Sequence, residues 1–146
     1  MNSFQKFIIL PFGKKALFLE AYLGLGYYRF ITLTCPFRRT VHLLGKKDME
    51  TPVSDEGVDI NTTKQVSEAI RIMSQHTFWE SQCLVQVYTA RRMLHKRKQK
   101  TTVYFGVSQN NCGEMVAHAW LRCGRIFVTG GNGHERFTVT GSFSDM

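Results

Sequence analysis

Proline, negative charge and long apolar runs are all scarce in this sequence. Three prolines and 12 glycines among 146 residues exclude a collagen-like or low-complexity chain, and 43% hydrophobic residues argue against disorder. Asp and Glu number only 11 against 19 Lys and Arg, which gives a formal net charge of +8. This excess favours an acidic partner, such as nucleic acid, an anionic membrane face or an acidic peptide, without choosing among them.

The sequence also offers no convincing signal peptide or membrane anchor. The apolar stretch 16–29 is interrupted by Glu20 and Arg29, and no small-residue cleavage site follows it. The four cysteines have spacings that do not resemble a secreted disulfide framework. We therefore expect one domain, short enough to hold a single core, that keeps reduced thiols in the cytoplasm and has no membrane span.

Hydrophobic spacing divides the chain into three parts. Residues 1–45 read as an N-terminal helical part in which Pro36 separates two helices. Residues 46–61 have the polar, acidic composition of a loop, and 62–146 form the core of the domain. The core begins with a helix that Thr62 or Thr63 caps and that ends near His76.

A second core helix carries Cys83 in its first turn. Ser81 is its expected N-cap, and a basic run, 91–100, crowds its C-terminal end, where the helix dipole favours cations. After this helix the apolar period changes to two, which predicts strands over 101–107, 116–123, 125–129 and 136–140. We predict an α+β fold, with helices followed by an antiparallel meander.

Cys83 is a candidate nucleophile because of its place in that helix. The free amides and the dipole of a helix N-terminus favour a thiolate, and the same amides can donate to the oxyanion that forms when the thiolate attacks a carbonyl. The plain alternative is that Cys83 is a small core residue beside Leu84.

His118 is the candidate base. It lies in the middle of a predicted strand and shares a strand face with Val116 and Trp120, so a polar ring is held among apolar neighbours. A Cys at a helix start that faces a His on an adjacent sheet makes the thiolate–imidazolium pair of cysteine peptidases and transglutaminases. A structural histidine, satisfied within the core or at its rim, is the alternative.

These residues sit in a context that resembles the transglutaminase-like leader peptidases of lasso-peptide biosynthesis. The chain is similar to the stand-alone form of that peptidase, which lacks its leader-recognition domain. The similarity runs in order from about Val66 to Phe143. It rests on six groups of residues, which are Trp79 to Gln86, Ala90-Arg91, Phe105 to Val107, Ala117 to Leu121, Gly130-Gly131 and Glu135 to Thr138.

The resemblance implies a papain/transglutaminase-like core with a Cys-His-acid triad. It implies that Cys83 is the nucleophile and His118 the base in removing the leader from a lasso-peptide precursor. The expected partners are the precursor peptide, a separate leader-recognition protein and the lasso cyclase, and the chemistry needs no cofactor or metal. The chain departs from the family in the third member, since Thr129-Gly130-Gly131 stands where the family commonly has an Asp.

Several further residues are candidates for the site. Asn132 could accept a hydrogen bond from the imidazole in place of the missing acid, although a turn role explains it equally well. Glu135 is a second candidate for this role. Trp79 and Trp120 could wall a peptide cleft, and Gln82 or Gln86 could donate to the oxyanion.

Three other functions compete with the peptidase. The missing acid favours a non-catalytic scaffold of the maturation complex. The basic run 91–100 suggests a nucleic-acid-binding module, but no RNA-binding signature accompanies it and we expect no nucleic-acid partner. A zinc site would combine Cys112, His118, Cys123 and His134, whose spacing is irregular and whose two strand members, His118 and Cys123, point to opposite faces.

Overall fold

The N-terminal part is built from helices, as the apolar spacing predicts. The computed structural model describes residues 5, 12–77 and 83–145. Helix α2 spans Phe12–Thr34 and ends just before Pro36, which has no amide hydrogen for a helical bond. Pro36 then stands at the N-cap of α3, Phe37–Thr40, and a 3-10 turn, η1, follows at Val41–Leu44.

The first core helix, α4, spans Ile60–Ser74 and begins earlier than expected. Its N-cap is Asp59, whose carboxylate accepts from the Thr62 amide at 3.1 Å and from the Thr62 hydroxyl at 2.8 Å. The expectation that Thr62 or Thr63 caps this helix is therefore wrong, because an acidic residue lies three positions before Thr62 and reaches its amide first. The second core helix, α5, spans Cys83–Lys96.

The five-stranded sheet is antiparallel, but its order departs from a meander. Strands β2 (Thr102–Gln109), β3 (Met115–Cys123) and β4 (Ile126–Thr129) follow one another as predicted. The last strand, β5 (Thr138–Ser144), pairs with β2 instead of β4, and the sheet order is β1-β5-β2-β3-β4. The predicted meander is wrong in its fourth strand, because the turn η2 (His134–Arg136) carries the chain back across the sheet.

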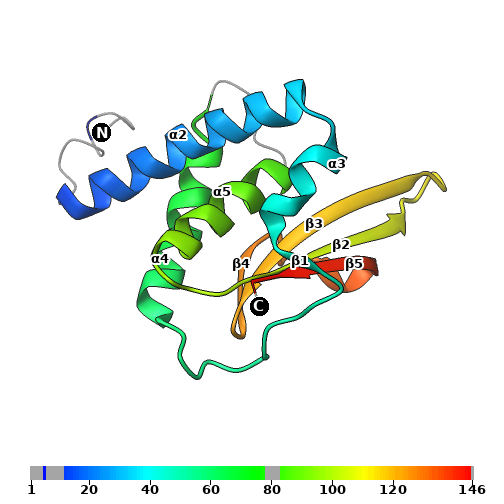
Figure 1. Ribbon diagram of the computed structural model, residues 1–146. Coiled ribbons are helices and arrows are strands. Elements are labelled where there is room, and N and C mark those ends of the chain that lie inside the picture. Colours follow the sequence, from blue (N-terminus) through cyan, green and yellow to red (C-terminus); the bar gives the residue numbers. More distant parts are fainter. Residues whose placement is uncertain (1–4, 6–11, 78–82, 146) are drawn as a thin grey trace.

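A short strand completes the far edge of the sheet. β1, Lys46–Lys47, pairs with Ser144 and Phe143 of β5. It lies in the segment 46–61 that the composition assigns to a loop. Figure 1 shows that the three long helices lie together on one side of the sheet and that the β2–β3 hairpin projects away from them.

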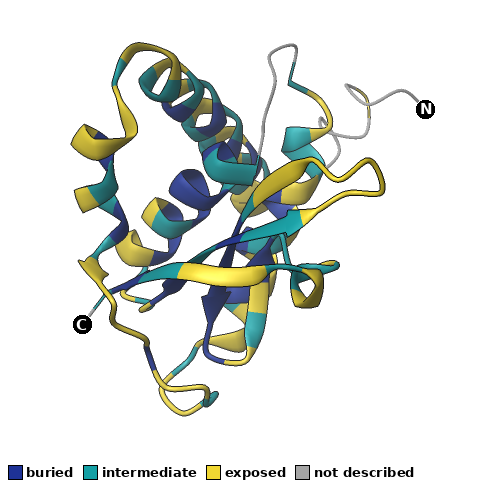
Figure 2. Cartoon of the chain, turned by 90° about the vertical axis from the view of Figure 1, so that its right-hand side faces the viewer, coloured by how far each residue is buried: buried dark blue, intermediate teal, exposed yellow. Residues whose placement is uncertain are grey.

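The hydrophobic core lies between these helices and one face of the sheet. Ala119, Leu121 and Cys123 of β3 pack in one cluster with buried residues of α2, α4 and α5. Figure 2 shows the buried residues gathered where the helices meet the sheet. Because side chains alternate along a strand, His118, Trp120 and Arg122 point to the opposite face. The fold is thus α+β, as predicted.

Candidate functional site

Within the described residues, one hydrogen bond to the backbone holds His118. Its Nε2 lies 2.8 Å from the carbonyl oxygen of Gly130, in the turn after β4. A carbonyl oxygen can only accept, so Nε2 must carry the hydrogen of the neutral ring. The lone pair is then on Nδ1, which is the ring atom left to act as a base.

The glycine at position 130 is required by this arrangement. Its φ of +67° lies in the left-handed region, and a Cβ there would come within 2.7 Å of the Ala119 carbonyl oxygen and 3.1 Å of the His118 Nε2. The turn thus brings a backbone acceptor to the place where the resemblance implies an acidic side chain. The sequence shows that the acid is missing, but it does not reveal that the Gly130 carbonyl bonds to His118 instead, because every residue has a backbone carbonyl.

Aromatic rings surround His118 on this face of the sheet. The ring centroid of Trp120 lies 5.7 Å away in a stacked arrangement, and that of Phe137 lies 5.0 Å away. Gly106, which pairs with His118 across the strands, leaves room for these side chains, because a Cβ there would come within 2.9 Å of the Trp120 ring and of the Phe137 Cβ. Trp120 is only 2% exposed and packs against these rings.

Cys83 is the first described residue of α5 and is half-buried against the core. Helix α5 packs against β3, but through the face that carries Ala119 and Leu121. His118 belongs to the other face, and in the described part of the chain no hydrogen bond joins it to Cys83. The structure therefore places Cys83 against the core and His118 on β3, with no hydrogen bond between them in the described residues.

The edge of β3 beside His118 is open in the described part of the chain. β4 pairs with β3 only over Leu121, Arg122 and Cys123. Beyond Leu121, toward His118 and Met115, the described residues place no strand against this edge of β3. The His118 ring is partly exposed here.

A hollow of about 520 Å³ lies beside β4 and contains Asn132. Asn132 is exposed and follows Gly130 by two residues. Gln86, one helical turn after Cys83, lines the same hollow, and so do Arg71 and Glu135. Sequence reasoning missed Arg71, because only the packing of α4 beside β4 brings it here.

Three residues of the expected site lie outside the described residues. These are the cleft residue Trp79, the oxyanion candidate Gln82 and the helix cap Ser81.

The basic end of α5 is partly neutralised by acidic side chains. Arg91 pairs with Asp145, and Glu20 of α2 accepts from Arg97 at 2.6 Å. Lys96 also lies 3.7 Å from Glu20. Several side chains of the basic run thus form ion pairs within the domain.

Among the residues whose placement is described, no group of three or more His, Cys, Asp or Glu is arranged to hold a metal ion. The helices in that part of the chain are all too short or too polar to cross a bilayer.

Comparison with known protein families identifies a match to most of the chain. A family model described as the transglutaminase-like superfamily matches residues 31–142, which is most of the chain. No curated protein and no solved structure matches the chain significantly. The matched region includes Cys83, His118 and Asn132, and the helices and antiparallel sheet are consistent with a transglutaminase-like core.

Proposed function

The chain belongs to the transglutaminase-like superfamily, and we propose on this basis that it is a cysteine peptidase that cleaves the leader from a lasso-peptide precursor. The observation that carries the proposal is the bond from His118 Nε2 to the Gly130 carbonyl, because it leaves Nδ1 free as a base. The predicted place of Cys83 in the first turn of this helix supports its role as the nucleophile.

The proposed reaction proceeds through an acyl-enzyme. Nδ1 of His118 takes the proton from Cys83 Sγ, and the thiolate attacks the carbonyl carbon of the scissile bond. The backbone amide of Cys83 donates to the resulting oxyanion. The imidazolium then gives its proton to the leaving amine as the C–N bond breaks, and a thioester remains on Cys83. Water, deprotonated by His118, attacks this thioester and releases the leader with a new carboxylate.

This mechanism requires Cys83 Sγ to lie within hydrogen-bond reach of His118 Nδ1. Hydrogen bonds of a catalytic pair are often long in the free enzyme and tighten with substrate, so a change on substrate binding is part of the proposal. The variant His118→Cys tests the approach directly. Under mild oxidation we expect a disulfide between positions 83 and 118, because such a bond needs Cβ atoms about 4 Å apart. Failure to form this disulfide, with precursor present, would count against the mechanism.

Asn132 is the proposed third member in the substrate-bound enzyme. It lies two residues beyond the Gly130 carbonyl that holds His118 in the structure, so a small shift of the turn would exchange one oxygen for the other. Trp79 and Gln82 are proposed to contact the substrate, and Trp120 to form the wall beside His118.

The proposed partners follow the family resemblance. The substrate is the precursor peptide, a separate leader-recognition protein presents it, and the lasso cyclase acts on the released core in the cytoplasm. Tethering by the recognition protein would raise the effective concentration of the scissile bond at a shallow site.

Mass spectrometry of a precursor peptide tests the proposal. We expect cleavage at the junction of leader and core with wild type, a strong increase when the recognition protein is added, and none with Cys83→Ala or His118→Gln. The matched control is Cys112→Ala, which removes an exposed thiol far along the sequence and should cleave normally. Cleavage that survives Cys83→Ala would overturn the proposed nucleophile.

A non-catalytic scaffold is the second candidate. The observation that favours it is that no hydrogen bond joins Cys83 to His118 in the described part of the chain. A scaffold would bind precursor and recognition protein, leave the precursor intact, and bind equally well as Cys83→Ala.

A further inference from the structure

Helix α2 carries two apolar faces, and only one of them is buried. Phe18, Ala21, Leu25 and Tyr28 point into the core at helical spacing. A second stripe lies on the opposite side, where each of its large apolar residues is 51–85% exposed: Phe12, Leu19, Leu23, Tyr27, Phe30 and Leu33. At 1.5 Å per residue this stripe is about 30 Å long. A helix that is apolar all round is normally covered on both sides.

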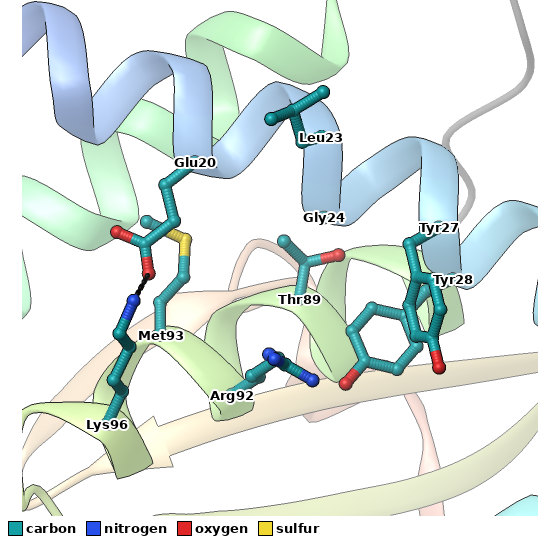
Figure 3. A pocket seen from close by; sticks show the side chains of 9 residues that line it. All are labelled: Glu20, Leu23, Gly24, Tyr27, Tyr28, Thr89, Arg92, Met93 and Lys96. Atoms are coloured by element: carbon teal, nitrogen blue, oxygen red, sulfur yellow. Dashed lines mark ion pairs between the residues drawn. The ribbon is translucent and has the colours of Figure 1, made fainter.

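A groove deepens the surface beside this stripe. It has a volume of about 370 Å³ and lies between α2 and α5 (Figure 3), with Leu23 and Tyr27 on the α2 side and Met93 on the α5 side. Gly24 allows the two helices to approach, because a Cβ there would lie 2.7 Å from the Thr89 methyl group. The groove is large enough to receive a bulky apolar side chain.

Cations line the α5 side of the groove. Arg92 and Lys96 are exposed, and Arg92 makes no ion pair with any residue in the described part of the chain. The carboxylate of Glu20 also lines the groove, but Arg97 and Lys96 already pair with it. The groove therefore combines an apolar wall with a surplus of positive charge.

We propose that this stripe and groove bind an amphipathic helix of a partner protein, whose apolar side chains enter the groove and whose acidic side chains face Arg92 and Lys96. Two other occupants fit less well. A second copy of this chain would bring like charges together, since each carries a net charge of +8. A bilayer surface would cover the stripe but would offer no side chain to fill the groove.

A synthetic helical peptide of about 18 residues tests the proposal, with leucines on one face and glutamates beside them. We expect its labelled form to bind wild type in an anisotropy titration, and to bind at least ten-fold more weakly to Leu23→Ser and to Arg92→Glu. The matched control is Val139→Ser, which changes an exposed apolar residue on β5 and should leave binding unchanged. Thermal unfolding verifies that each variant is folded.

Four outcomes would overturn the proposal. The first is that the acidic peptide does not bind, and the second is that a peptide with lysines in place of the glutamates binds equally well. The third is that the protein binds phosphatidylcholine–phosphatidylglycerol vesicles in place of the peptide, in a way that depends on Leu23. The fourth is that sedimentation shows a dimer that depends on Leu23. The inference does not rest on the proposed peptidase, since every readout is binding or mass and none is cleavage.

Discussion

The carbonyl of Gly130 does at His118 what a carboxylate does in an acid-containing triad, but without a charge. It fixes the orientation and the tautomer of the ring through Nε2. A neutral acceptor stabilises the imidazolium less than a carboxylate does, because it adds a dipole and not a full charge. In other triads one aspartate both orients the histidine ring and stabilises its positive charge. Here the Gly130 carbonyl orients the His118 ring but stabilises the charged ring only weakly.

Replacing Gly130 by alanine should displace His118. The new Cβ would lie 2.7 Å from the Ala119 carbonyl oxygen, and the left-handed backbone adds a strain of about 1 kcal/mol. We expect the neutral ring of wild type to hold its hydrogen on Nε2 in ¹⁵N NMR spectra, and the variant to show a mixture of tautomers. Peptidase activity should fall about 100-fold, in line with the loss of a positioned base.

Gly133→Ala is the control for this change. Gly133 also has a positive φ, +76°, but its Cβ would meet nothing within 4 Å. The variant should carry the same backbone strain while leaving the tautomer and the activity of wild type. An unchanged His118 spectrum in Gly130→Ala would show that the carbonyl does not position the ring.

The residues of the site differ in how far the sequence reveals them. Cys83 and His118 could be named because a thiol in a first turn and an imidazole among apolar strand residues are both unusual. Gly130 could not, because its contribution is a backbone oxygen. The face of β3 that packs against α5 was also hidden, since it depends on how the helices and the sheet meet in three dimensions.

At the scale of elements, helices α2 and α5 are fitted to each other at Gly24. The Thr89 methyl group occupies the space that a side chain at position 24 would need, and the Thr89 hydroxyl donates to the Val85 carbonyl at 2.8 Å, which limits its rotation. Helix propensity alone favours alanine over glycine by about 1 kcal/mol. Packing against Thr89 therefore opposes propensity at this position.

A double-mutant cycle can separate these two effects. Gly24→Ala alone should lower the free energy of unfolding by about 1–2 kcal/mol, because overpacking outweighs the gain in propensity. In the background of Thr89→Ser, which removes the methyl group and keeps the hydroxyl, the same change should be neutral or stabilising. Chemical denaturation of the four proteins measures the coupling. If Gly24→Ala costs the same in both backgrounds, the close approach of the helices is not the cause.

The same two helices are also joined by charge. Burial by itself would raise the pKa of Glu20, but the hydrogen bond and the charge of Arg97, helped by Lys96, outweigh it and hold the pKa below its usual value of 4.5. A lowered pKa in the folded state stabilises the fold above the unfolded pKa, and this contribution is lost as the pH falls through the folded pKa.

Glu20→Gln should therefore destabilise the protein in a pH-dependent way. The expected loss at pH 7 is about 1 kcal/mol, since the pair is partly exposed. The difference from wild type should shrink below pH 4.5 and vanish once Glu20 is protonated in both states. Denaturant titrations from pH 3 to 7 measure it, with the exposed Glu68→Gln as the control. A difference that does not change with pH would mean that the ion pair is not its source.

Elements with a local cause could be predicted, and pairings between distant segments could not. The break at Pro36 and the order of β2, β3 and β4 follow from residues within a few positions of each other. The pairing of β5 with β2 depends on a return across the sheet that no local pattern specifies. The strand β1 likewise exists only because β5 offers it an edge.

At the scale of the whole molecule, Arg122 connects the loop that contains Thr51 and Pro52 to the face of the sheet opposite the helices. This side chain is 3% exposed, and its guanidinium donates to the carbonyls of Thr51, Pro52 and Gly124 at 2.8–3.2 Å. The Tyr104 hydroxyl accepts from it as well, at 3.1 Å. These bonds join the loop, β2 and β3 around one buried cation, which carbonyl and hydroxyl oxygens satisfy.

Arg122→Met should loosen this loop more than it disturbs the core. The methionine fills part of the volume but leaves three carbonyl oxygens without their donor, so we expect a loss of about 2–4 kcal/mol in the free energy of unfolding. Under native conditions a protease specific for glutamate should cut first after Glu50 or Glu56. The control is Arg125→Met in the neighbouring turn, where the side chain is exposed and only the backbone amide bonds to Asp55. Cleavage spread over the whole chain would indicate general unfolding and not release of the loop.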